Sequence, residues 1–293
     1  MPVTTDQQAA LDLIDLDQNW SDLKSGKTVP ELALALLRPL QTSQLGILQG
    51  AGLALAHQVE TDGQSRAVKG LELAYHNRDH IRDTLVALNL LLKASPSPLS
   101  LEDKQVTIVA MVGHDLGHEG LPNRLPRELE AKSWGLASTL LKPLALGRQT
   151  LKRLQTIILM TDPKDYSRLA ARVRHSVLSI QIGMAVDADL FASLLPSRGF
   201  RLGSRLADEQ VHAGVPQAKG FATLKGRAMF LKSAPLLSEA IRMLGMPTLI
   251  AAQLSVIEQL TESDRLRLWT PSWGDEFTSL VHDHLTRDTK LKI

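Results

Sequence analysis

Residues 75–92 read YHNRDHIRDTLVALNLLL, and the spacing of the leucines in this stretch indicates the fold class. These leucines recur at steps of three and four residues, at Leu85, Leu88, Leu91 and Leu92. Side chains at such steps share one face of an α-helix. The pattern therefore predicts an amphipathic helix that buries its leucines against the rest of the protein.

The same spacing extends along most of the chain. It recurs at Leu151, Leu154, Ile157 and Ile158. The apolar segment Val106–Val112 is short enough for a strand. No hairpin partner for it is visible, however, so we expect a buried helix there. We predict an all-α fold, a multi-helix bundle.

Clusters of helix-breaking residues interrupt the pattern at 61–69, 95–100 and 196–220. They predict turns, and the last cluster predicts a long loop with short helical pieces. Residues 1–60 carry no motif, and we expect them to form a helical N-terminal extension packed on the core. Residues 61–293 would then form the main domain.

The composition limits the classes of partner. Lys and Arg number 33 against 31 Asp and Glu, a net charge of +2, and the basic residues are scattered. This balance argues against a nucleic-acid-binding protein, which concentrates positive charge in a stripe. The N-terminus lacks the order of a signal peptide, and the apolar runs fall short of a membrane span. We therefore expect a cytoplasmic protein with neither nucleic acid nor membrane as a partner.

Four of the nine histidines fall in two tight groups. The first group lies in residues 75–80 (YHNRDH), and the second lies in residues 114–123 (HDLGHEGLPN). The distance of 34 positions from His80 to His114 leaves room for one helix, a turn rich in Pro and Ser, and a returning helix. That arrangement would bring the two groups together.

Histidine next to aspartate suits a site for two metal ions. An imidazole binds one ion through a single nitrogen, whereas a carboxylate has two oxygens and can bridge two ions. The chain has no cysteine, so thiolate ligands are excluded and a metal must be held by His, Asp or Glu.

Both groups resemble the signatures of one family. Residues 75–83 are similar to the Y-H-N-x-x-H-x-x-D signature of class I cyclic nucleotide phosphodiesterases, and residues 114–123 look like their H-D-x-x-H-x-G-x-x-N motif. These enzymes are all-α members of the HD superfamily of metal-dependent phosphohydrolases. The resemblance covers about residues 70–260 and implies that 61–293 is a catalytic domain of this type.

The resemblance implies a set of metal ligands. His80, His114, Asp115 and Asp189 would bind the tighter ion, zinc, iron or manganese, with Asp115 bridging to a second ion, magnesium or manganese. Asp189 is selected because VDADL at 186–190 resembles the family's H-x-A-D-[IL] segment. Asp187 is a rival two positions away that the sequence leaves open.

The resemblance also implies catalytic roles. His76 would be the general acid that protonates the departing ribose oxygen, and His118 would hold or orient metal-activated water. Glu130, in a Leu-Glu pair, would contact waters of the second ion, and Asp162 matches the family's Thr-Asp pair. Tyr75 and Asn123 would contact the substrate.

The base pocket departs from the family. The purine-clamping glutamine is not evident, and Arg227 stands at the best match, with Phe230 where the base-stacking Phe would lie. If Arg227 faced the pocket, it would suit an extra phosphate or carboxylate. A surface position is the alternative. Tyr166 and Val186 replace two family histidines.

We therefore expect a phosphodiesterase that converts cAMP or cGMP to the 5′-monophosphate by metal-activated hydroxide, with a small-molecule nucleotide as its partner. One alternative is an HD phosphohydrolase that acts on another phosphoester, such as a nucleotide, a cyclic dinucleotide or a guanosine polyphosphate. Another is a non-catalytic nucleotide sensor or scaffold. The chain is compatible with a homodimer.

Overall fold

The computed structural model describes residues 4–40, 46–166, 169 and 176–287. Within these ranges the chain has no strand, and its one isolated bridge joins Thr223 and Leu268. The prediction of an all-α, multi-helix fold is confirmed. The α-helices are α1 (Thr5–Gln18), α2 (Trp20–Lys24), α3 (Val29–Leu37), α4 (Gly46–Val68), α5 (Arg78–Ala94), α6 (Leu101–Gly113), α7 (Glu128–Leu141), α8 (Arg148–Leu159), α10 (Val177–Leu194), α11 (Pro196–His212), α12 (Leu224–Ser233), α13 (Glu239–Met243), α14 (Met246–Gln259), α15 (Glu262–Leu266) and α16 (Pro271–Arg287). The 3-10 helices are η1 (Arg38–Leu40), η2 (Lys142–Leu144), η3 (Pro163–Asp165) and η4 (Ala218–Ala222).

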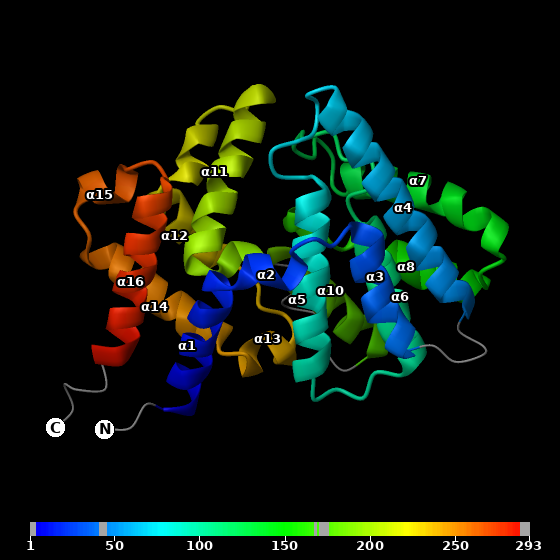
Figure 1. Ribbon diagram of the computed structural model, residues 1–293, viewed down its shortest axis with the longest axis horizontal. Coiled ribbons are helices and arrows are strands. Elements are labelled where there is room, and N and C mark those ends of the chain that lie inside the picture. The colour runs from blue at the N-terminus through cyan, green and yellow to red at the C-terminus, as the bar shows by residue number, and fades with distance from the viewer. Residues whose placement is uncertain (1–3, 41–45, 167–168, 170–175, 288–293) are drawn as a thin grey trace.

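Helix α10 is the central helix, and it packs against α5, α6 and α11 (Figure 1). Within the described ranges it is also the one helix with the length and composition to cross a membrane. However, 67% of it is buried inside the protein. A helix that is largely covered by neighbouring helices is apolar on most of its faces for that reason, so α10 lies in the core of the bundle.

Helix α6 contains the apolar segment Val106–Val112, and every residue of that segment is buried. The expected buried helix is confirmed. Ser100 begins it with a capping box, because its hydroxyl accepts from the Asp103 N–H while the Asp103 carboxylate accepts from the Ser100 N–H. The predicted turn at 95–100 is also confirmed, since α5 ends at Ala94 and α6 begins at Leu101.

The turn predicted at 61–69 is wrong. Helix α4 runs through this segment to Val68 and therefore crosses residue 60. Gly63 does not break the helix, since its missing side chain makes room for Arg78, whose Cδ lies 2.2 Å from where a Cβ would be. The helix ends at Val68, and the turn that follows contains Gly70, where φ is +67°.

The long loop predicted at 196–220 is also wrong over most of its length. Residues 196–212 form the regular helix α11. Pro196 stands at its start, where proline is tolerated, and Gly199 and Gly203 are positions of close packing. A Cβ at Gly199 would lie 2.2 Å from the backbone oxygen of Ser193, and one at Gly203 would lie 2.6 Å from that of Phe221. The glycines are thus explained by neighbouring backbone.

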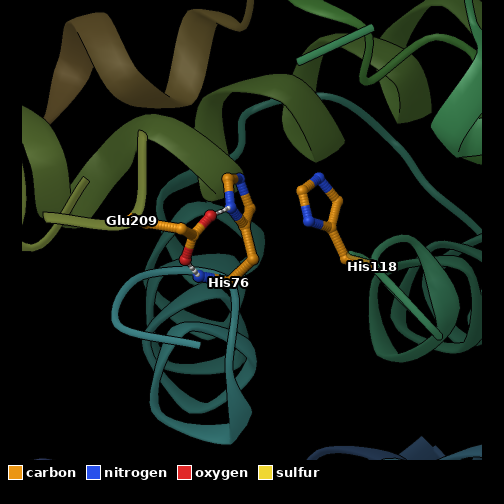
Figure 2. Close-up of side chains that lie close together, drawn as sticks. All are labelled: His76, His118 and Glu209. Carbon is orange, nitrogen blue, oxygen red and sulfur yellow. Dashed lines mark hydrogen bonds and ion pairs between the residues drawn. The ribbon is translucent and has the colours of Figure 1, made fainter. Parts of the chain in front are cut away.

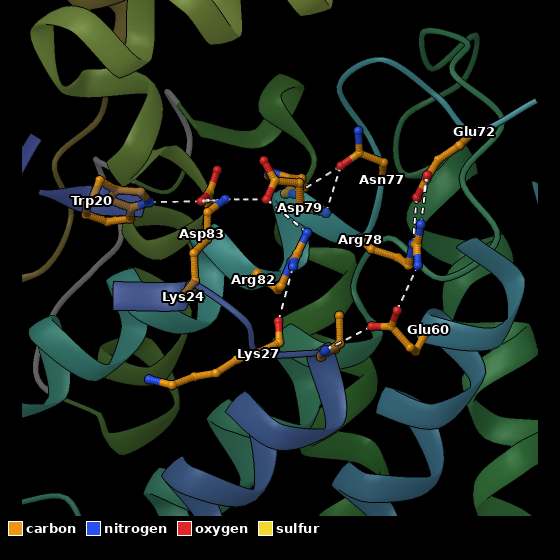
Figure 3. A network of polar contacts seen from close by, with 12 residues as sticks. Trp20, Lys24, Lys27, Glu60, Glu72, Asn77, Arg78, Asp79, Arg82 and Asp83 are labelled. Atoms are coloured by element: carbon orange, nitrogen blue, oxygen red, sulfur yellow. Dashed lines mark hydrogen bonds and ion pairs between the residues drawn. The ribbon is translucent and has the colours of Figure 1, made fainter. Parts of the chain in front are cut away.

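The first helices pack on two parts of the bundle. Helix α1 contacts α14 and α16, and α3 contacts α4, α5 and α6. Between them, α2 contributes Trp20 and Lys24 to a polar network on α5 (Figure 3). The indole N–H of Trp20 donates to Asp83 at 2.8 Å, and the Lys24 ammonium contacts both Asp79 and Asp83. This network connects the N-terminal helices to the start of α5.

Candidate metal centre

The start of α5 places His80. Asn77 is the N-cap, and its side-chain oxygen accepts from the N–H groups of Asp79 at 2.8 Å and His80 at 3.2 Å. His80 therefore lies in the first turn, and its side chain is 4% exposed. His76 precedes the helix, so the two histidines are not on one helical face.

The end of α6 places His114. Its Nδ1 lies 2.8 Å from the Met111 carbonyl oxygen, which requires Nδ1 to carry the proton. In the neutral ring the other nitrogen, Nε2, carries the lone pair, and it is a buried atom that has no hydrogen-bond partner among the described residues. A carbonyl that fixes the tautomer in this way is typical of metal-binding histidines.

Four predicted ligands meet at one point. His80 Nε2 lies 2.9 Å from Asp189 Oδ1 and 3.3 Å from Asp115 Oδ2. His114 Nε2 lies 3.4 Å from the same oxygen of each aspartate. One ligand atom each from His80, His114 and Asp189 lie within 4.8 Å of one another, from α5, α6 and α10.

The electrostatics of this cluster favour a cation. Burial alone would raise the pKa of Asp115 and Asp189, but the neighbouring histidines hold both values below the ordinary range. Burial alone would lower the pKa of His80, yet Tyr75, Asp115 and Asp189 raise it well above 6.5. The cluster thus keeps two carboxylates ionised and stabilises positive charge beside them.

The donor set fits a divalent metal ion. Two imidazole nitrogens and a carboxylate oxygen are typical ligands of zinc, iron or manganese, and the second oxygen of a carboxylate can bridge to another ion. The free Nε2 of His114 is the atom that such an ion would satisfy. His80, His114, Asp115 and Asp189 are therefore a candidate metal centre.

The structure separates Asp189 from its rival. Asp187 is buried on another side of α10, where its oxygens accept from the N–H groups of Leu237 at 2.9 Å and Ser238 at 2.6 Å. These bonds hold the segment that leads into α13. Asp189, and not Asp187, lies with the histidines.

A second cluster lies beside the first and is formed by His76, His118 and Glu209 (Figure 2). The Glu209 carboxylate contacts Nδ1 of His76 with one oxygen. Its other oxygen accepts from the backbone N–H groups of Tyr75 at 2.8 Å and His76 at 3.0 Å. Glu209 thus fixes both the ring and the backbone of His76.

The rings of His76 and His118 are stacked, with centroids 3.8 Å apart and planes inclined by 21°. The Gly120 N–H donates to Nδ1 of His118 at 3.0 Å, so Nδ1 is unprotonated. Burial, followed by the neighbouring His76, lowers the pKa of His118 to about 4. His118 is therefore neutral near pH 7, which limits the positive charge on this stacked pair.

Glu130, Asn123 and Asp162 lie along the neighbouring edge. The Asn123 amide nitrogen donates to both oxygens of Glu130, at 3.1 and 2.9 Å, so Asn123 positions Glu130. Asn123 does not line the cavity of about 690 Å³ that lies beside the metal centre. Burial, with Asp162 and Asp115 nearby, raises the pKa of Glu130 to about 7. Asp162 accepts from the N–H groups of Arg127 at 2.6 Å and Lys164 at 2.9 Å, which hold the chain at η3.

A cavity of about 690 Å³ opens next to the metal centre. Tyr75 belongs to both places, since its ring centroid lies 5.0 Å from that of His80 and its hydroxyl lies 3.1 Å from Oγ of Ser193 in the cavity wall. Phe221 and Phe230 are among its lining residues. The predicted positions of Tyr75 and Phe230 at a pocket are therefore compatible with the structure.

Arg227 also borders the cavity, but its donors point elsewhere. The guanidinium donates to the carbonyl oxygens of Ser193, Leu194 and Leu195, at 3.1, 3.1 and 2.6 Å, and to Gln253. It thus caps the C-terminal end of α10. Neither a role in binding a substrate anion nor a surface position fits this buried side chain; both expectations are corrected, because the exposed carbonyls of a helix end attract a cation.

Glu209 is the residue that the sequence did not reveal. It lies 133 positions after His76, on α11, and no motif surrounds it. Only the packing of α11 brings it to the histidines. Tyr166, which replaces a family histidine, is buried and donates to the Thr161 carbonyl oxygen at 3.0 Å.

No protein-family model matches the chain, and no curated protein matches it. The candidate metal centre therefore rests on the geometry and chemistry of its own residues.

Proposed function

We propose that this protein is a metal-dependent phosphodiesterase that hydrolyses a 3′,5′-cyclic nucleotide to the 5′-monophosphate. The observation that carries the proposal is the meeting of His80, His114, Asp115 and Asp189 at one buried point, with a free imidazole nitrogen among them. Divalent ions bound there supply Lewis-acid chemistry, acidifying water and offsetting charge on the phosphate oxygens.

His76 would act as the general acid in this reaction. Glu209 holds its Nδ1, which leaves Nε2 to donate a proton to the departing ribose oxygen. His118 stacks on His76 and stays neutral, so it would help to orient water without adding charge. The organic part of the substrate would enter the cavity beside Tyr75 and contact Phe230.

A second candidate function is hydrolysis of another phosphoester at the same centre. It is favoured by Arg227, whose donors are engaged by the end of α10 and are not available to recognise a base. The cavity then discriminates by shape and apolar contact, which separates similar substrates only weakly. A non-catalytic nucleotide sensor would keep the metal and lack turnover.

The test is phosphate-ester turnover by the purified protein with added Mn²⁺ or Mg²⁺. The substrates are cAMP, cGMP, a cyclic dinucleotide, a nucleotide and a guanosine polyphosphate, and the variant is His114→Ala. The matched control is His212→Ala, because His212 is an exposed histidine on α11 outside both clusters.

Turnover of cAMP or cGMP that His114→Ala abolishes and His212→Ala leaves intact would support the proposal. Turnover of another ester alone would favour the second candidate. Metal binding without turnover of any substrate would point to the sensor, and the absence of metal binding in the wild type would overturn all three.

A further inference from the structure

One face of α11 carries three arginines, Arg198, Arg201 and Arg205, spaced three and four residues apart. Such positions are neighbours on a helix surface. Two of them have acidic partners on α5. Arg198 contacts both oxygens of Asp83, with Nε at 3.1 Å, and Arg205 contacts Asp79 at 3.2 Å. These contacts turn this face of α11 toward the start of α5.

Arg201 lies between them on the helix. Within the described part of the chain its guanidinium takes part in no hydrogen bond and no ion pair, although the residue is half-buried. Its Nε is a buried atom without an acceptor. A half-buried charge with an unsatisfied donor costs free energy unless an acceptor reaches it.

The surroundings of Arg201 do not balance its charge. The charges of Asp79 and Asp83 act on Arg201, but these two acids are already shared by Lys24, Arg82, Arg198 and Arg205 (Figure 3 shows the part on α2 and α5). A third acid, Asp17, accepts from the backbone N–H groups of Ser197 and Arg198. Across this network the cations Lys24, Arg82, Arg198, Arg201 and Arg205 outnumber the carboxylates of Asp17, Asp79 and Asp83, so positive charge is in excess.

The charged form of Arg201 is disfavoured where it lies. Burial, followed by the charges of Arg198 and Arg205, lowers its pKa. An anion beside Arg201 would raise this pKa again and would stabilise the charged guanidinium. Solvent reaches the neighbourhood, because the Arg205 side chain is 37% exposed and that of Asp79 is 25% exposed.

We propose that Arg201 and Arg205 form a binding site for a phosphate group, separate from the metal centre. Guanidinium groups present paired N–H donors that match phosphate oxygens, and a phosphate dianion matches an excess of two positive charges. This inference is independent of the proposed function.

The site is connected to both clusters of the metal centre. Asp79 and Asp83 face it from α5, whereas His80 of the same helix faces the candidate metal ligands. Glu209 lies one turn beyond Arg205 on α11 and holds His76. A phosphate bound here would therefore hold α11 against α5 close to His76, the proposed general acid.

The experiment is calorimetric titration of the full chain with inorganic phosphate after dialysis against a chelator, which removes the metal centre as a competing site. AMP is the second probe. The variants are Arg201→Gln, which removes the unpaired charge, and Arg201→Lys, which keeps the charge without the paired donors. The control is Lys232→Gln, which removes the same charge from an exposed residue.

We expect one phosphate per chain, with affinity weakened at least about tenfold in Arg201→Gln and unchanged in Lys232→Gln. His114→Ala should bind phosphate as the wild type does, because the site excludes the metal ligands. Without phosphate, Arg201→Gln should melt no lower than the wild type, since the lost cation forms no ion pair within the described residues. Equal phosphate affinity in the wild type and in both Arg201 variants would overturn the proposal, as would no binding to the wild type up to about 10 mM.

Discussion

At the level of single residues, Asp187 and Asp189 on α10 have opposite surroundings. Asp189 lies against two histidines, and Asp187 accepts from two backbone N–H groups. Loss of a group that only supports a metal ligand lowers metal affinity about 10–100-fold. Asp189→Asn removes a candidate ligand itself, so its metal affinity should fall by at least that factor. Asp187→Asn should keep the metal and lose about 1–3 kcal/mol of stability, because an amide satisfies those N–H groups poorly.

Metal content and thermal unfolding of the two variants check this prediction. Equal metal content in both would remove Asp189 from the ligand set.

Glu209 gives a prediction about the proton donor. Glu209→Gln should lower kcat for a cyclic nucleotide by about 10–100-fold, because His76 loses the partner that orients it. It should leave hydrolysis of bis(p-nitrophenyl) phosphate almost unchanged, because nitrophenolate departs without a proton. Steady-state kinetics on both substrates make the comparison. Equal losses on both would show that Glu209 has only a structural role.

His118 makes stability depend on pH in the metal-free protein. Its pKa is about 4 in the folded protein, against about 6.5 in an unfolded chain. Between these values the unfolded chain binds a proton that the folded protein does not. The contribution of neutral His118 to the free energy of unfolding is therefore complete above about pH 6.5 and is lost as the pH falls toward 4. His118→Gln should lose less Tm than the wild type between pH 7 and pH 5, and an identical loss would contradict the assignment.

At the level of the elements, two helical glycines should respond in opposite directions. Gly199→Ala in α11 places a Cβ 2.2 Å from the Ser193 carbonyl oxygen, so α10 and α11 must separate, at a cost of about 1–3 kcal/mol or more. Gly135→Ala in α7 meets nothing within 4 Å and should add about 0.5–1 kcal/mol. Chemical denaturation measures both, and the prediction fails if Gly199→Ala is neutral.

Gly63 and Gly199 explain why helix boundaries were harder to predict than the fold class. The leucine spacing of α5 is a local signal, and it predicted the helix directly. Gly63 and Gly199 look like breakers in a sequence, because the Arg78 side chain and the Ser193 backbone that require them come from elsewhere in the fold. At α4 and α11, tertiary packing therefore favours a helix where the local sequence predicted a turn or a loop.

The same distinction applies to the site. His80, His114 and Asp115 stand in short motifs that resemble those of a known family, and the structure brings them together. Glu209 acts across 133 positions, and Arg227 is defined by carbonyls at the end of another helix. Partners of this kind are fixed only once the helices have packed.

For the whole molecule, the polar network around Asp83 joins α2, α5 and α11, and Figure 3 shows its part on α2 and α5. Asp83→Asn would leave Lys24 and Arg198 buried without this partner, which should cost about 3–5 kcal/mol. Because the network connects the N-terminal helices with the core, we expect one transition at a lower temperature, with circular dichroism and tryptophan fluorescence changing together. Two separate transitions would show that the N-terminal helices unfold independently.

The distribution of the candidate ligands along the chain has a consequence for how the protein is made. His80 and His114 precede Asp189 on α10, and Glu209 on α11 comes later still. At about 5–20 residues per second, a ribosome needs on the order of ten seconds to pass from His80 to Asp189. A nascent chain therefore displays its imidazoles before the carboxylate that completes the set. Metal binding at this candidate centre would then be a late event, set by the packing of α10 against α5 and α6.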